Sequence, residues 1–250
     1  MNKYFTANGI DFSKLWHCFG NSYHLASLDS IKGLLRASQT NVLPINTHRL
    51  NKETARKGLE LGYAGITLDF FEQNYDTSDL HKMLNINLQT TANEAVDKTK
   101  LAFDLTGERI VKLEVLDKTH KDSNQNEIIK AAEALKNWNS SLMILPLFYN
   151  EVKVARSLID LGCPILRVMG SSIGQRKGIV DTDSLKEICS MGVPVILDGG
   201  IGSIDHALEA MNCGATGVLI NSMLFEFKEG PVEVMKNFAT KFYEYLEQQS

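Results

Sequence analysis

Two charged side chains interrupt an apolar run that reads IVKLEVL from Ile110 to Leu116. Side chains of a β-strand alternate between its two faces, so the apolar residues between them would share one face and Lys112 and Glu114 the other. At a sheet edge such a lysine only opposes aggregation. A closed barrel has no edge, and there both charges would point into the interior, which makes them candidate catalytic groups.

A lysine amine held against apolar walls loses its proton more readily, because burial disfavours the ammonium and lowers its pKa. The neutral amine can attack a carbonyl carbon and form an imine. Glu114, two residues on, could move protons during that reaction. Its negative charge also raises the pKa of Lys112, and the sequence leaves open which effect is larger.

A second candidate group lies in PVILDGGIGS, from Pro194 to Ser203. Asp198 would end the seventh strand of a barrel, where catalytic groups of such folds lie. The glycines after it, Gly199 and Gly200 among them, allow a ligand to approach the backbone, and Ser203 can cap the next helix. A simple tight turn would explain the same residues.

Asn221 and Ser222 end the next apolar run and favour the phosphate interpretation, because barrels bind phosphate in the loops after strands seven and eight. A third loop, Gly170–Ile179, contains Arg176 and Lys177, which could meet an anion or an acidic partner. His48 and Arg49 are similarly ambiguous. Each of these charged residues could equally lie in a solvated loop and bind nothing.

The second half of the chain alternates apolar runs with amphipathic segments, a pattern typical of parallel strands covered by helices on both faces. Glycines close several of the helices. The expected strands are Ile110–Leu116, Ser141–Phe148, Pro164–Gly170, Pro194–Gly200 and Gly217–Met223, and the expected helices are Asn126–Asn137, Glu151–Leu161, Asp183–Met191 and Ser203–Asn212.

The first half is less regular. Its candidate strands are Trp16–Phe19, Asn41–Asn46 and one of Ala64–Phe70 or Met83–Asn87, and its candidate helices are Leu28–Ala37, Lys52–Leu61 and Ala92–Leu105. The resulting eight strand–helix units predict a single parallel (β/α)8 barrel of the TIM type rather than an open doubly wound sheet. One domain is expected over residues 1–250, with residues 1–15 as an N-terminal extension and residues 232–247 as a C-terminal helix.

Composition limits the classes of function. A net charge of −4 and a pI near 5.9 argue against a general nucleic-acid binder. The chain shows no apolar run of membrane-spanning length and no signal-peptide core, so we expect a cytoplasmic protein. The four cysteines are scattered and the histidines are not paired, which predicts reduced thiols, no metal and no cofactor.

Taken together, these motifs resemble thiazole synthase of bacterial thiamin biosynthesis. The resemblance rests on VKLEV at Val111–Val115, the stretch ARSLIDLGCPILRVMGSSIG that ends at Gly174, VPVILDGGIGS and GATGVLINS, within about Thr91–Tyr243. That family is a (β/α)8 barrel. It builds thiazole phosphate carboxylate from 1-deoxy-D-xylulose 5-phosphate, dehydroglycine and sulfur carried as a thiocarboxylate on a small ubiquitin-like protein.

Carried over by position, the resemblance implies that Lys112 forms the imine and that Glu114 and Asp198 are the acid–base pair. It also implies two partners, the sugar phosphate and the small ubiquitin-like sulfur carrier. We further expect the chain to form a homo-oligomer. The residues that the resemblance assigns to the sugar phosphate are Gly174, Gly199, Gly200, Asn221 and Ser222.

The sequence departs from the family pattern in four places. Phe19-Gly20-Asn21-Ser22 replaces a Gly-Thr-Gly, Leu84–Leu88 replaces Pro-Asn-Thr-(Ala/Ser)-Gly, and Arg167-Val168-Met169-Gly170 replaces Met-Pro-Leu-Gly. The stretch Asn51–Lys82 is longer than usual. We expect the first three of these departures to lie where further substrates enter, and Arg167 to favour an anionic group such as a carboxylate or thiocarboxylate. Two alternatives therefore stay open: an imine-forming lyase or transferase for another phosphorylated sugar, and a non-catalytic barrel that binds a carrier protein.

Overall fold

The computed structural model describes residues 3–19, 27–62 and 64–249. The elements follow in the order β1 (Tyr4–Ala7), β2 (Ile10–Ser13), β3 (Leu15–His17), α1 (Leu28–Ser38), β4 (Val42–Asn46), η2 (Ala55–Gly58), β5 (Glu60–Leu61), α2 (Leu68–Asn74), β6 (His81–Gln89), α3 (Ala92–Thr106), β7 (Ile110–Val115), α4 (Gln125–Trp138), β8 (Met143–Tyr149), α5 (Val152–Asp160), β9 (Leu166–Met169), α6 (Thr182–Cys189), β10 (Val195–Asp198), α7 (Ile204–Asn212), β11 (Gly217–Ile220), η3 (Ser222–Phe225) and α8 (Pro231–Gln248).

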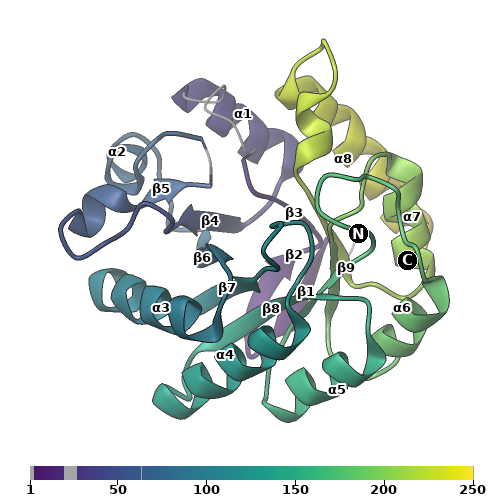
Figure 1. Ribbon diagram of the computed structural model, residues 1–250. Coiled ribbons are helices and arrows are strands. Elements are labelled where there is room, and N and C mark those ends of the chain that lie inside the picture. Colours follow the sequence, from purple (N-terminus) through teal and green to yellow (C-terminus); the bar gives the residue numbers. More distant parts are fainter. Residues whose placement is uncertain (1–2, 20–26, 63, 250) are drawn as a thin grey trace.

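The described strands form a (β/α)8 barrel, as the sequence predicts. Parallel pairing runs in the order β3-β11-β10-β9-β8-β7-β6-β4, and helices surround this ring (Figure 1). In a parallel barrel the carboxyl ends of the strands meet at one face, where catalytic groups lie. Lys112, Glu114 and Asp198 are therefore carried by strands that point toward the same face.

Among the described residues, β3 and β4 form no strand pair, and other contacts close the barrel at the seam between them. Near the carboxyl ends, β5 pairs antiparallel with β4, and Gly62 follows it with φ 45°. A Cβ atom on Gly62 would lie 1.9 Å from the carbonyl oxygen of Cys18, so only glycine fits there. At the other end the Ser13 hydroxyl lies 3.1 Å from that of Thr40.

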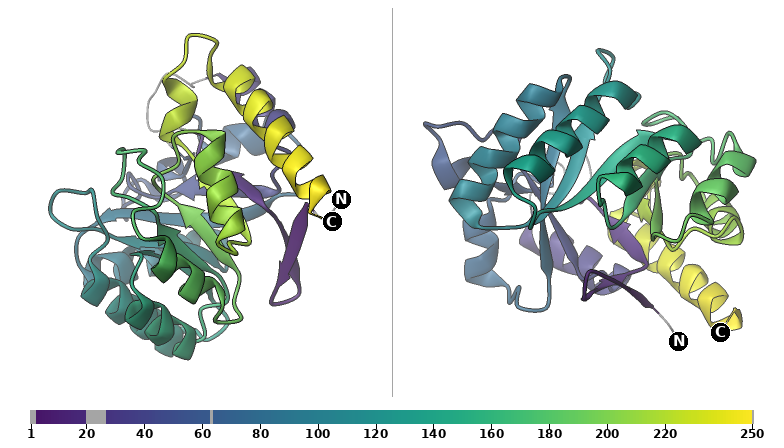
Figure 2. Two further views of the ribbon diagram at one scale, coloured as in Figure 1. Left: turned by 90° about the vertical axis from the view of Figure 1, so that its right-hand side faces the viewer. Right: turned by 90° about the horizontal axis from the view of Figure 1, so that it is seen from below.

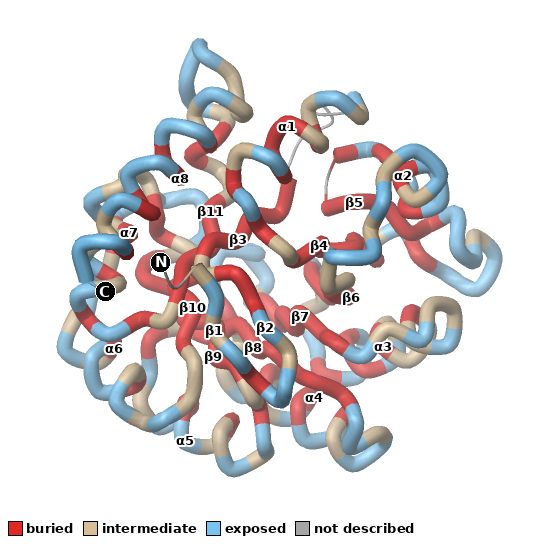
Figure 3. Tube along the Cα trace, turned by 180° about the vertical axis from the view of Figure 1, so that it is seen from behind, coloured by how far each residue is buried: buried red, intermediate tan, exposed pale blue. Residues whose placement is uncertain are grey.

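Two apolar layers hold the barrel together. One packs the outward faces of the strands against the helices and includes Val111, Leu113 and Val115 of β7. The other fills the amino-terminal half of the barrel interior and contains Phe12 and Trp16. Figure 3 shows the resulting pattern, with buried strands inside and exposed helix surfaces outside. Because this filling occupies only one half, the interior near the carboxyl ends remains available for polar groups.

The expected extension at residues 1–15 contains the antiparallel hairpin β1–β2, which lies across the amino-terminal end of the barrel (Figures 2 and 3). Its Phe12 ring lies 5.9 Å from the Trp16 ring, between ring centroids. The C-terminal helix expected at residues 232–247 is α8, which packs on α1, with Val232 against Gly33.

Two expectations for the first half needed correction. The segment Lys52–Leu61 is not a helix: it contains the short 3-10 turn η2 and then β5, whose residues are buried. Of the two candidate third strands, Met83–Asn87 is the one in the barrel, as part of β6, whereas Ala64–Phe70 contributes the start of α2. The long stretch Asn51–Lys82 thus forms most of the connection from β4 to β6 and contains η2, β5 and α2.

Candidate active site

Four charged side chains lie buried together in the barrel interior. Lys112 and Glu114 come from β7, Arg167 from β9 and Asp198 from the end of β10, and none is more than 9% exposed. The predicted inward direction of Lys112 and Glu114 is confirmed, since the intervening apolar side chains pack outward against the helices. A buried charge is costly unless a partner balances it, so the contacts among these groups matter.

The four groups form one connected network. Lys112 Nζ donates to Asn85 Oδ1 at 3.1 Å and to Glu114 Oε1. Arg167 Nη2 donates to the same Glu114 oxygen at 2.6 Å, and its Nε donates to Asp198 Oδ2 at 2.7 Å. Glu114 therefore lies between two cations, and proton transfer between Lys112 and Glu114 needs no movement of the chain.

Electrostatics decides the question that the sequence left open. Burial and the nearby Arg167 guanidinium lower the pKa of Lys112, but the opposing effects of Cys18, Glu114 and Asp198 are larger, and the pKa is raised. Burial also raises the pKa of the Cys18 thiol to about 11, so this thiol is uncharged at neutral pH, and Glu114 and Asp198 are then the groups that raise the pKa of Lys112. The contact with the Glu114 carboxylate thus favours the ammonium form of Lys112.

Glu114 is held in the complementary state. Burial raises its pKa, but Lys112 and Arg167 together outweigh burial, and the pKa of Glu114 is lowered. The resting site therefore contains an ammonium, a guanidinium and the Glu114 carboxylate in direct contact. An imine can form only after Lys112 loses a proton, and Glu114 is the acceptor in contact with it.

A pocket of about 350 Å³ opens above this network at the carboxyl ends of the strands. Every residue that the sequence singled out for catalysis or for phosphate lines it: Lys112, Glu114, Asp198, Gly174, Gly199, Gly200, Asn221 and Ser222. The structure thus brings together groups from four separate stretches of the chain. Their individual roles remain proposals.

The glycine-rich wall of the pocket consists of two interlocked loops. The Gly178 N–H donates to the Gly200 carbonyl at 2.8 Å. A Cβ on Gly200 would lie 2.5 Å from the Gly178 oxygen, so the loops can approach only because this residue is glycine. The Gly202 N–H is turned away and donates to His206 Nδ1. Asn221 Oδ1 is a buried atom without a hydrogen-bond partner in the described structure, and it is available to a ligand donor.

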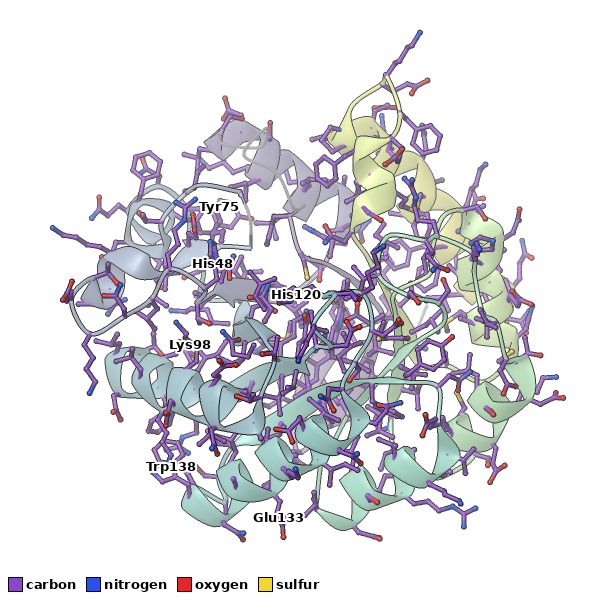
Figure 4. All side chains as sticks on the ribbon, viewed as in Figure 1. His48, Tyr75, Lys98, His120, Glu133 and Trp138 are labelled. Carbon is purple, nitrogen blue, oxygen red and sulfur yellow. The ribbon has the colours of Figure 1, made fainter. Side chains whose placement is uncertain are left out.

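Three of the four ambiguous basic residues, all except Lys177, have an ion-pair partner within the described part of the chain. Arg176 pairs with Glu226, which ties the Gly170–Ile179 loop to the segment after η3. Arg49 lies 3.3 Å and His48 3.9 Å from the Glu60 carboxylate on β5. In Figure 4, His48 lies well to one side, whereas His120 lies near the centre of the view over the barrel.

The expectation for Arg167 was wrong. Its side chain is fully buried and bonded to two carboxylates and to the Leu145 carbonyl, so it is not exposed to an incoming anion. It is the second residue of β9 and is not among the residues that line the pocket. Of the other divergent positions, Leu88 lines the pocket, and Gly20, Asn21 and Ser22 lie outside the described residues.

Sequence reasoning missed several pocket residues. Asn85 and Asn87 alternate with apolar residues on β6, the same signal that identified Lys112 and Glu114. Cys18 and His120 carried no comparable pattern, because each follows or lies outside a regular strand. Leu88 lines the pocket mouth with φ 66°, a conformation that costs a leucine about 1–2 kcal/mol.

Comparison with known proteins identifies the family of this chain. The family model described as thiazole biosynthesis protein ThiG matches residues 17–242. The chain belongs to this family. The match to ThiG includes the irregular first half, and so extends beyond the Thr91–Tyr243 region in which the motifs are recognisable.

Among curated ThiG relatives, the thiazole synthase of Idiomarina loihiensis is 31% identical over 204 residues, covering 76% of each chain. That of Shewanella oneidensis is 26% identical over 233 residues, covering 92% of this chain and 84% of its own. In structure, the Amycolatopsis orientalis BexX/CysO complex is similar, with a TM-score of 0.81 at 22% identity over 96% of this chain and 92% of the other. That structural likeness supports the barrel fold.

Neither a membrane helix nor a metal cluster is found in the part of the chain that the structure describes. No described helix is both long and apolar enough to span a bilayer. No group of three or more histidine, cysteine, aspartate or glutamate side chains there is arranged to hold a metal ion.

Proposed function

We propose that this ThiG-family protein forms thiazole phosphate carboxylate through an imine on Lys112. The substrates would be 1-deoxy-D-xylulose 5-phosphate, dehydroglycine and a sulfur-carrier thiocarboxylate. The observation that carries the proposal is the contact between buried Lys112 and Glu114 at the floor of a pocket. The glycine-rich turns at Gly199–Gly200 and the residues Asn221–Ser222 line the same pocket, where a sugar phosphate would bind.

The first step needs a neutral amine. When the ketose enters and excludes water, Lys112 transfers a proton to Glu114, leaving an amine and a carboxylic acid. The amine attacks the C2 ketone and gives a carbinolamine. Protonated Glu114 then returns its proton to the departing hydroxyl, so that one water leaves and the imine forms. Asn85, which accepts a hydrogen bond from Lys112, orients the amine during this step.

The later steps use the second carboxylate. Asp198 lines the same pocket and is joined to Glu114 through Arg167. Removal of the C3 proton by Asp198 or Glu114 and return of a proton to the former imine carbon move the carbonyl to C3. The thiocarboxylate sulfur adds there. The carrier leaves as a carboxylate that takes the former C3 oxygen with it, and one water is lost from the sugar chain. The sulfur then bonds to the carbon of dehydroglycine, and its nitrogen closes the ring at C2 by displacing Lys112, which is released as the free amine.

A carrier-protein partner is consistent with the structural neighbour, which is a complex of BexX with CysO. The pocket opens at the carboxyl face of the barrel, where an extended carrier terminus could reach Lys112. The Lys121 carbonyl accepts a hydrogen bond from Ile173 N at 2.8 Å, so two of the loops around the opening are joined. We propose that the carrier binds over these loops.

A second candidate keeps the imine but changes the co-substrate. The observation in its favour is the composition of the pocket mouth, where Leu88 and Ile173 are exposed large apolar residues. Cys18 also lines the pocket beside the charged groups. In this case the enzyme would act on a phosphorylated sugar through Lys112 without producing a thiazole.

Borohydride trapping tests the proposal. The protein is incubated with 1-deoxy-D-xylulose 5-phosphate and borohydride, and the modified lysine is located by peptide mass mapping. We expect one reduced adduct at Lys112. Lys112→Arg should abolish it, because a guanidinium does not form this imine. Lys177→Ala, which removes an exposed lysine of a neighbouring loop, should leave it intact.

Product analysis separates the two candidates. With dehydroglycine and the thiocarboxylate carrier present, formation of thiazole phosphate carboxylate supports the first. An adduct at Lys112 without thiazole supports the second. Labelling that persists in Lys112→Arg would refute both.

A further inference from the structure

Arg167 is the most deeply buried charged group of the site and reaches across several strands. From β9 its guanidinium contacts Glu114 on β7, the Leu145 carbonyl on β8 and Asp198 on β10. It has no exposed surface. A planar guanidinium can hold two carboxylates at once in a fixed geometry, which a lysine ammonium cannot do as well.

The network is balanced in charge. Lys112 and Arg167 supply two positive charges, and Glu114 and Asp198 supply two negative ones. Among the described residues, Cys18 is the further titratable group that acts on Lys112, and its thiol is uncharged at neutral pH because burial raises its pKa to about 11. Without Arg167, one ammonium would face two carboxylates in a buried site. Two carboxylates that share one cation cannot both ionise easily, so one of them would bind a proton.

We propose that Arg167 is a positioning residue that fixes Glu114 and Asp198 beneath the pocket and balances their charge, so that both are ready as proton acceptors. The inference rests on the proposed function of Lys112 and deepens it. In that mechanism Glu114 accepts the lysine proton, and Asp198 or Glu114 accepts a carbon-bound proton, so both must be unprotonated at the start. Arg167 itself touches no substrate.

A purely structural cross-strand tie would predict a different outcome. Such a tie would affect stability and the amount of folded protein but would leave the ionisation of Glu114 unchanged. Charge balance predicts that the ionisation changes even when the fold is intact. The decisive variant is Arg167→Met, because the family pattern has methionine at this position and its chain is similarly long and unbranched.

The experiment measures two quantities in wild type, Arg167→Met and Arg167→Lys. One is the rate of borohydride trapping with 1-deoxy-D-xylulose 5-phosphate as a function of pH. The other is the titration of the Glu114 carboxyl by ¹³C NMR without substrate, assigned by comparison with Glu114→Gln. Arg156→Met is the matched control, since Arg156 pairs with Glu187 on the exposed surface at 2.9 Å.

For Arg167→Met we expect the acid limb of the rate profile and the Glu114 titration both to move up by about one pH unit or more, as loss of an adjacent cation does. Arg167→Lys should keep the acid limb and the Glu114 titration within about 0.3 pH unit of wild type, because it keeps the positive charge. This variant should form the trapped adduct about tenfold more slowly, because an ammonium holds the two carboxylates in a poorer geometry. Arg156→Met should match wild type.

If folded Arg167→Met shows the same acid limb of the trapping rate and the same Glu114 titration as wild type, the inference is overturned. Absence of trapping in wild type would refute the proposed imine, while the NMR titration would still decide the role of Arg167. Thermal unfolding establishes that each variant is folded. If the methionine variant does not fold, Arg167→Gln, which removes the charge but keeps hydrogen-bonding groups, gives the same comparison.

Discussion

A substitution at Gly174 tests whether the glycine-rich wall of the pocket binds the phosphate, because a matched glycine elsewhere separates the effect of backbone strain from the effect on ligand binding. The φ of Gly174 is 80°, and a Cβ added there would meet no atom within 4 Å. Gly192, in the turn between α6 and β10 at the opposite end of the barrel, has φ 83° and equally open space. Alanine at either position is strained to the same extent, but only Gly174 lines the pocket.

The expected effects follow from this geometry. An L-residue in the left-handed region costs about 1–2 kcal/mol, so both alanine variants should lose that amount of unfolding free energy. This corresponds to roughly 2–8 °C in Tm for a chain of this size. In Gly174→Ala the methyl group enters the space assigned to the phosphate. Loss of one charge-assisted contact, about 1.5–3 kcal/mol, should raise the half-saturating sugar phosphate concentration roughly 10- to 150-fold.

The assay is borohydride trapping at increasing sugar phosphate concentration, with urea unfolding measured in parallel. At saturation the trapping rate should remain within about threefold of wild type, because Lys112 is untouched. Gly192→Ala should show the stability loss without the change in half-saturation. Equal half-saturation in both variants would show that the phosphate binds elsewhere and would refute the assignment of this wall.

Two further predictions concern stability. Burial lowers the pKa of His17 to about 3. The folded protein therefore keeps His17 neutral, while the unfolded chain binds a proton at this residue below about pH 6.5. As the pH is lowered below that value, the free energy of unfolding decreases by up to ~1.4 kcal/mol per pH unit. His17→Gln should reduce the loss between pH 7 and pH 5, measured by urea unfolding, by about 2 kcal/mol; an identical loss would mean that folded His17 is charged. Gly62→Ala should cost about 2–5 kcal/mol through collision with the Cys18 carbonyl, whereas Gly9→Ala, with φ 76° and open space, should cost about 1–2 kcal/mol. Equal thermal shifts in the two alanine variants would contradict this account of the seam.

The local pattern of the sequence determined much of the second half of the barrel. Strand alternation in IVKLEVL is a property of neighbouring residues, so the inward direction of Lys112 and Glu114 could be predicted without knowing any partner. The turn at Gly199–Gly200 was readable for the same reason. The first half was harder, because Lys52–Leu61 has helical residue types but is extended at β5, where pairing with β4 outweighs local preference.

Only the tertiary structure decided how the charges act. Arg167 lies 53 residues from Glu114 and 31 from Asp198 along the chain, and no local pattern relates the three. Their contact depends on the order of strands β7 to β10 and on the curvature that brings inward side chains together. The pKa of Lys112 depends on the same distances, because burial and the surrounding charges act in opposite directions and their balance is set by position in space. Sequence spacing identified the inward-facing lysine, and three-dimensional proximity determines the direction in which its pKa shifts.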